Sequence, residues 1–170
     1  QFVGANPSRS VQLKYFLKKR HTFGKMTMEI QDISGNVISS LGPGKSKGIN
    51  IVNWNYRMKQ PKVAKGKIFS YGGFTSPMVE AGKYKAVLKK GKDTYEHNFE
   101  VIYDPKSSLT KEDRTFKHAT TMKMYDMIEE LAYLVYELDA ILVKAEALKK
   151  KKIVSKLMAL KESLVVTTGD

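Results

Sequence analysis

The chain has 170 residues, a net charge of +13 and no cysteine, and 42% of its residues are hydrophobic. This content allows a packed core and argues against disorder, while the lack of cysteine excludes a disulfide framework and a thiolate metal site. No stretch has the apolar length of a membrane span, and Gln1-Phe2-Val3 does not begin a signal peptide. We therefore expect the chain to belong to a longer protein.

The positive charge is concentrated toward the N-terminus. Residues 1–60 carry ten Lys or Arg and two Asp or Glu. Residues 106–170 carry twelve Lys or Arg and ten Asp or Glu. A basic face can bind nucleic acid, anionic glycans or a charged membrane. No nucleic-acid-binding motif accompanies these lysines, and exposed lysines also keep the edges of sheets from pairing. We interpret them as a solvated face and expect no nucleic-acid partner.

Alternating apolar and polar residues predict a series of strands over the first 105 residues. Ser34-Gly35-Asn36 predicts a tight hairpin turn, because Gly and Asn tolerate positive φ. The predicted strands span residues 11–17, 26–31, 48–57, 84–88 and 95–103. Asp104-Pro105 ends this pattern, so we expect one domain over residues 1–105.

Trp54, the only tryptophan, is the expected centre of the core. Burying an indole removes a large apolar area from water, and Tyr84 and Phe99 are the aromatic residues expected beside it. The alternative is that Trp54 serves as a platform on which a sugar ring stacks. His97 shares a face with Phe99, which predicts a half-buried histidine. The remaining expected core residues are Val11, Leu13, Ile30, Val52, Leu88 and Val101.

Between residues 58 and 78 the alternation lapses, which predicts a long excursion from the sheet. Such loops are often functional, although a simple insertion is the alternative. Tyr56, Tyr71 and Phe74 surround Gly72-Gly73 and are the candidate ligand-binding residues, because exposed aromatic rings can stack on a polysaccharide.

Residues 106–168 contain no Gly or Pro, and the apolar period becomes helical. Thr110 with Asp113 resembles an N-terminal cap. A first apolar seam contains Met124, Ile128, Leu131, Val135, Leu138, Leu142 and Ala145, and a second contains Ile153, Leu157, Leu160 and Leu164. The lysine run 149–152 separates them, which predicts an antiparallel α-helical hairpin over residues 106–170. We expect it to dock on the sheets; a partner-binding face is the alternative.

The sequence offers no set of residues suited to catalysis. Glu29, Glu96 and Glu100 are scattered on strands and form no carboxylate couple. The three histidines lie on different elements without metal-ligand spacing, and no Gly-rich phosphate loop is present. We therefore expect no catalytic residue, no metal and no cofactor.

Several segments in this order resemble a known family: Asn6-Pro7, the strand at 11–17, the hairpin at 28–37, the Trp54 segment at 50–57 and Gly82-Lys83-Tyr84. The chain is similar, over nearly its whole length, to the C-terminal region of secreted bacterial BNR-repeat proteins with a sortilin-like β-propeller, often labelled glycosyl hydrolases. Its first part also resembles the Ig-like domain of flagellar hook-capping proteins. Asn55 and Ala81 depart from the family, which usually has Asp and Pro there.

The resemblance implies an α+β protein with an Ig-like, fibronectin III-like antiparallel β-sandwich before the helical hairpin. It also implies a secreted, periplasmic or cell-surface location and a β-propeller in the same parent chain. Any glycosidase chemistry would lie in that propeller. The expected function is thus a non-catalytic accessory module for packing or assembly, and the alternative is a carbohydrate-binding module.

Overall fold

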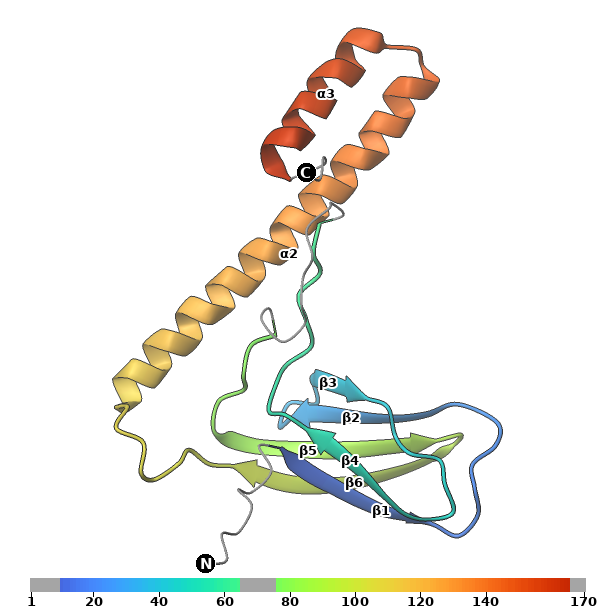
Figure 1. The fold of residues 1–170 in the computed structure, drawn as a ribbon, viewed down its shortest axis with the longest axis vertical. Coiled ribbons are helices and arrows are strands. Elements are labelled where there is room, and N and C mark those ends of the chain that lie inside the picture. The colour runs from blue at the N-terminus through green and yellow to red at the C-terminus, as the bar shows by residue number, and fades with distance from the viewer. Residues whose placement is uncertain (1–9, 65–75, 166–170) are drawn as a thin grey trace, which may run out of the picture. The chain divides into compact units, whose positions relative to one another are not determined.

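The computed structural model describes residues 10–64 and 76–165 and has the α+β class that the sequence predicts. Figure 1 shows strands in the first part of the chain and helices in the last. The elements in the described residues are β1 (Val11–Leu17), β2 (Met26–Asp32), β3 (Val37–Leu41), β4 (Gly48–Trp54), β5 (Gly82–Lys90), β6 (Asp93–Val101), α2 (Lys111–Ala147) and α3 (Lys151–Leu164).

The strands form two antiparallel sheets, in an arrangement compatible with a β-sandwich. One sheet has the order β1-β4 and the other β3-β2-β5-β6. The predicted turn at Ser34-Gly35-Asn36 joins β2 to β3, with Gly35 at φ +86°. The Asp32 carboxylate accepts the Ser34 and Asn36 amide N–H groups at 2.9 and 2.8 Å, which closes the turn. The strand β3 that follows was not among the predicted strands.

One hydrophobic core lies between the two sheets, and Trp54 is at its centre. Trp54 is fully buried, and its ring lies 5.8 Å from Tyr84 and 5.9 Å from Phe99 in edge-on contacts. Its Nε1–H donates to the Arg57 carbonyl oxygen at 2.9 Å, so burial leaves no polar atom of the indole unpaired. The other buried members are Leu13, Leu17, Met26, Met28, Ile30, Val52, Ala86 and Leu88.

The inner face of β6 is only partly covered. Tyr95 is 57% exposed and His97 is also exposed, although their partners across the ladder, Leu88 and Ala86, belong to the core. Opposite residues of an antiparallel pair point to the same face. The prediction of a half-buried His97 is therefore wrong, because β6 is the edge of a four-stranded sheet that faces a sheet of only two strands.

Helix α2 begins with the capping box that the sequence predicts. The Asp113 N–H donates to Thr110 Oγ1 at 3.1 Å, and the Thr110 N–H donates to Asp113 Oδ2 at 3.0 Å. The helix ends just before Lys149, whose φ of +53° reverses the chain within the lysine run. α3 then packs on the second half of α2, where Lys161 Nζ lies 2.6 Å from Asp139 Oδ1.

Only part of the predicted helical seam is buried. Val135, Leu138, Leu142 and Ala145 are buried, whereas Met124 is 61% exposed and α3 has no buried residue. Met124 stays exposed because α3, with 14 residues, covers only part of the 37-residue α2. In the first half of α2 the buried side chain is instead Tyr125, and Ala132 is buried just beyond the middle of the helix.

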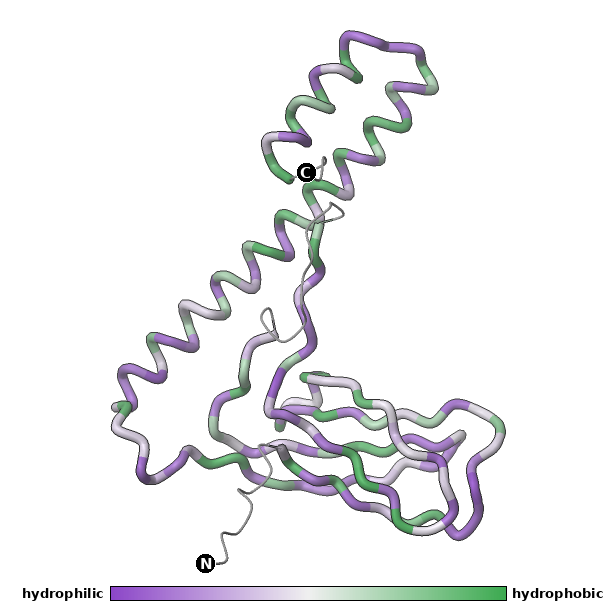
Figure 2. Tube along the Cα trace, in the orientation of Figure 1, coloured by the Kyte–Doolittle hydropathy of each residue, from purple (hydrophilic) through white to green (hydrophobic). Residues whose placement is uncertain are grey.

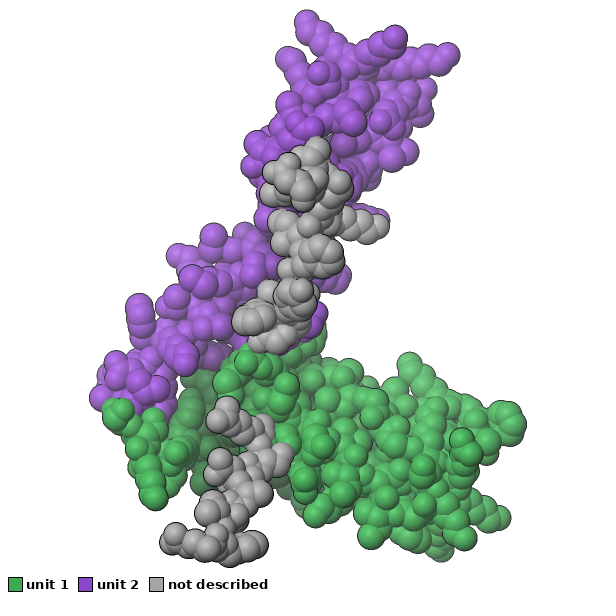
Figure 3. All heavy atoms as spheres, in the orientation of Figure 1, with its two compact units in different colours: residues 1–59, 78–108 green, residues 60–77, 109–170 purple. Residues whose placement is uncertain are grey.

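The chain divides into two compact units, which Figure 3 shows in different colours. We call residues 1–59 and 78–108 the β unit, and residues 60–77 and 109–170 the helical unit. The helical unit thus contains part of the predicted excursion in addition to the helices. The docking of the helices on the sheets stays a prediction.

Within the helical unit, residues 60–64 lie alongside α2. The Lys62 N–H donates to Glu129 Oε1 at 3.0 Å, and the Tyr125 hydroxyl donates to the Gln60 carbonyl oxygen at 3.4 Å. The Lys62 ammonium donates to Tyr133 Oη at 2.8 Å and lies 4.7 Å from the centre of that ring. These contacts explain why Tyr125 is buried in a half of α2 that α3 does not reach.

Candidate interaction surfaces

The three aromatic residues predicted to bind a ligand are not gathered into one described site. Tyr56 is half-buried, with its ring 5.8 Å from the Trp54 ring and its backbone at φ +61°. The Val79 N–H donates to the Tyr56 carbonyl oxygen at 2.8 Å. Tyr71 and Phe74 lie outside the described residues. Tyr56 therefore contributes to the core cluster around Trp54.

Several carboxylates of the β unit are already engaged by lysines. Glu29 accepts from Lys89 Nζ at 2.8 and 2.9 Å, and this interaction is the main reason that its pKa is lowered. Glu96 lies 2.8 Å from Lys85 Nζ. Among residues 10–64 and 76–165, no group of His, Asp and Glu is arranged to hold a metal ion. None of the described helices has the length and apolar character needed to cross a membrane.

The outer face of the two-stranded sheet carries an apolar patch. Phe16 on β1 lies opposite Ile49 on β4, and Ile51 lies two residues further along the same face. Their side chains are 64%, 73% and 51% exposed, respectively. We call these three residues the β1–β4 patch. Adjoining apolar side chains on a surface are typical of a face that another protein surface covers.

A second apolar surface lies along α2. Met127, Leu134, Ile141 and the C-cap Leu148 recur at intervals of seven residues, and each is at least half exposed. Seven residues make about two helical turns, so these side chains share one face, which we call the α2 stripe. Figure 2 shows green apolar segments recurring between purple polar ones along α2.

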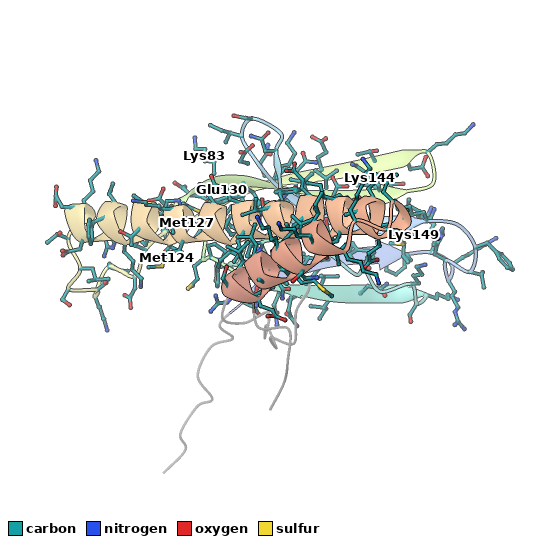
Figure 4. All side chains as sticks on the ribbon, turned by 90° about the horizontal axis from the view of Figure 1, so that it is seen from above. Lys83, Met124, Met127, Glu130, Lys144 and Lys149 are labelled. Atoms are coloured by element: carbon teal, nitrogen blue, oxygen red, sulfur yellow. The ribbon has the colours of Figure 1, made fainter. Side chains whose placement is uncertain are left out.

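Charged residues at the same interval border the α2 stripe. Lys123, Glu130, Glu137 and Lys144 each precede a member of the stripe by four residues. Figure 4 labels Met127, Glu130 and Lys144 among the side chains that α2 presents. Sequence reasoning selected a neighbouring seam and missed this stripe. The seven-residue repeat of apolar side chains was visible in the sequence. The sequence did not show which of the two adjacent apolar faces of α2 is covered by α3.

The chain was compared with models of protein families, with curated proteins and with solved structures, and none of them matches.

Proposed function

We propose that this chain is a non-catalytic accessory module that packs against another domain of its parent protein. The observation that carries the proposal is the β1–β4 patch, with three large apolar side chains exposed on adjoining positions of one sheet face. Fully burying one such side chain stabilises a contact by about 1.5–3 kcal/mol. Because the three side chains are between 51% and 73% exposed, covering all of them offers about twice that gain, from which the costs of association are subtracted.

The finer fold that we propose for the β unit is an Ig-like, fibronectin III-like sandwich. With β1 assigned as strand B, the sheets correspond to B–E and C′–C–F–G, which supports this topology. Tyr84, the third residue of β5, occupies the place of a tyrosine corner on strand F. Its hydroxyl donates to the Glu80 carbonyl oxygen at 2.8 Å, four residues upstream, and burial is the main reason that its pKa is raised.

The proposed covering domain is the β-propeller that the sequence resemblance implies, and the proposed location is secreted, periplasmic or cell-surface. In such a parent the chain would brace the propeller and leave any glycosidase chemistry to it. Polysaccharide binding remains the other candidate, but Tyr56 already packs on Trp54 and gives it no support.

Co-elution of this chain with the region encoded upstream of it tests the proposal. Phe16→Ser with Ile49→Ser should weaken the association by at least about tenfold, because two apolar contacts are lost. The matched control is Ile33→Ser with Ile102→Ser, which changes two apolar residues outside the patch that are at least as exposed as Phe16 and Ile49. Equal weakening by both pairs, or no weakening by the first, would reject the β1–β4 patch as the packing surface.

A further inference from the structure

An open groove separates the edge of β1 from the inner face of β6. Its volume is about 340 Å³, and its walls are β1 from Val11 to Tyr15 on one side and Tyr95 to His97 on the other. It adjoins a second hollow of about 830 Å³ that follows the chain from Tyr15 to Thr22. Tyr15, Leu88 and Tyr95 line both, so we treat the two as one feature, the β1–β6 groove.

Core residues line the β1–β6 groove. Leu13, Met28 and Leu88 belong to the core cluster and also line this opening. Tyr95, which points to the same face as Leu88, is 57% exposed. A segment lying in the groove would therefore remove apolar area from water on both its walls, which is favourable at about 25 cal/mol per Å².

The edge of β1 can pair with a further strand. In the described part of the chain β1 pairs with β4 alone, so no described strand lies along the other side of its backbone. An unpaired edge presents N–H and C=O groups that an extended peptide can bond, while its alternate side chains enter the adjacent groove. An extended peptide fits this combination better than a compact ligand, because the β1 edge is seven residues long.

The positive charge of the β1–β6 groove favours an acidic peptide. Lys14, Lys18, Lys19, Arg20 and Lys90 line it, and none of them forms an ion pair among the described residues. The one acid in the lining, Glu96, is already paired with Lys85 at 2.8 Å. An occupant that brings carboxylates toward the Leu17 end of β1 would satisfy these cations.

We propose that the β1–β6 groove binds an extended acidic segment of a partner protein, which adds a strand to the edge of β1 that no described strand pairs with. Apolar side chains at alternate positions of that segment contact Leu13, Leu88 and Tyr95, and its acids face Lys18, Lys19 and Arg20. If a second copy of this chain paired through its own β1, the lysines of the two copies would face and repel each other. Nucleic acid would match the cations but would leave the apolar lining without a partner.

The test uses the full chain and a fluorescent nine-residue peptide, capped at both ends, with Val at alternate positions and three Glu at one end. We expect saturable binding by anisotropy that weakens with salt. The triple variant K18E/K19E/R20E should bind about tenfold more weakly, because three surface charge pairs are lost and the introduced carboxylates repel those of the peptide. The control K111E/K117E/K152E changes the net charge equally on the helices and should bind as the unaltered chain does.

Backbone pairing is tested with peptides N-methylated at alternate residues. Methylation of the peptide edge that faces β1 should abolish binding, whereas methylation of the other edge should not, because only one edge bonds to β1. Equal binding of both methylated peptides would mean a purely ionic contact and would overturn the proposal. So would tighter binding of a single-stranded oligonucleotide at the same residues.

Amide exchange in the free chain tests whether the edge is available. Some amides of β1 should exchange quickly without peptide and slow down when it is bound. Full protection of all β1 amides in the free chain would show that the edge is already paired, either by a segment of this chain in the place of strand A of the Ig-like fold proposed above or by a second copy, and the proposal would fail. These readouts involve other residues than the β1–β4 patch, so either proposal can fail alone.

Discussion

Trp54 is the residue whose removal should affect the β unit most. Its ring is fully buried and contacts Tyr56, Tyr84 and Phe99. Trp54→Ala should lower the free energy of unfolding by about 3–5 kcal/mol, because it leaves a large cavity among rings that cannot all close in. A urea melt followed by circular dichroism measures this change. A loss below about 1 kcal/mol would contradict the central place of Trp54 in the core.

Glu29 should make stability depend on pH in the acid range. Its pKa is lowered from its ordinary value of 4.5, chiefly by the hydrogen bond from Lys89, so the folded state favours the ionised form. Its contribution is complete above pH 4.5 and is lost as the pH falls through the lowered pKa. Glu29→Gln should therefore destabilise the chain at pH 7, and the difference should shrink in more acidic solution. Melts of Glu100→Gln, an exposed change on β6, provide the control.

At the scale of single elements, α2 is more apolar than α3 can cover. We expect a peptide of residues 106–170 to be only partly helical or to self-associate, because it lacks residues 60–64 and exposes the α2 stripe. Sedimentation with circular dichroism measures both properties. Leu134→Glu with Ile141→Glu should remove the self-association by placing charges on the stripe. A fully helical monomeric peptide would show that the helices are stable even when the α2 stripe is exposed and the β unit is absent. The two parts would then be separate domains.

Tyr125 joins residues 60–64 to α2. Its side chain is buried where that segment lies against the helix. Tyr125→Ala should destabilise the helical unit by about 2–3 kcal/mol through the lost apolar contact. The matched control is Tyr136→Ala, an exposed residue of the same helix. Amide exchange across α2 measures the difference, and an equal effect of the two changes would mean that Tyr125 packs no more tightly than Tyr136.

At the scale of the whole molecule, two compact units predict two regions of unequal stability. Amide exchange in Tyr125→Ala should quicken in α2 and leave β2 and β5 unchanged. This outcome is expected because Tyr125 makes its described contacts within the helical unit. If the strands of the β unit lose protection to the same degree, the two units unfold together.

Local patterns in the sequence determined most of the elements. Alternation predicted five of the six described strands, with β3 missed. Gly35 and Asn36 predicted the hairpin turn, and Thr110 with Asp113 predicted the capping box, because each depends on residues close together in the chain. The burial of Trp54 was also visible as an expectation, since the indole is the largest apolar group available to the core.

Only the tertiary structure decided which apolar faces stay open. The exposure of Tyr95 and His97 depends on the number of strands in the opposite sheet, and the α2 stripe depends on the length of α3. The passage of residues 60–64 along α2 likewise depends on contacts with Tyr125 and Glu129, more than 60 positions away. Pattern reasoning tells which face of an element is apolar, but it does not tell whether another element is there to cover it.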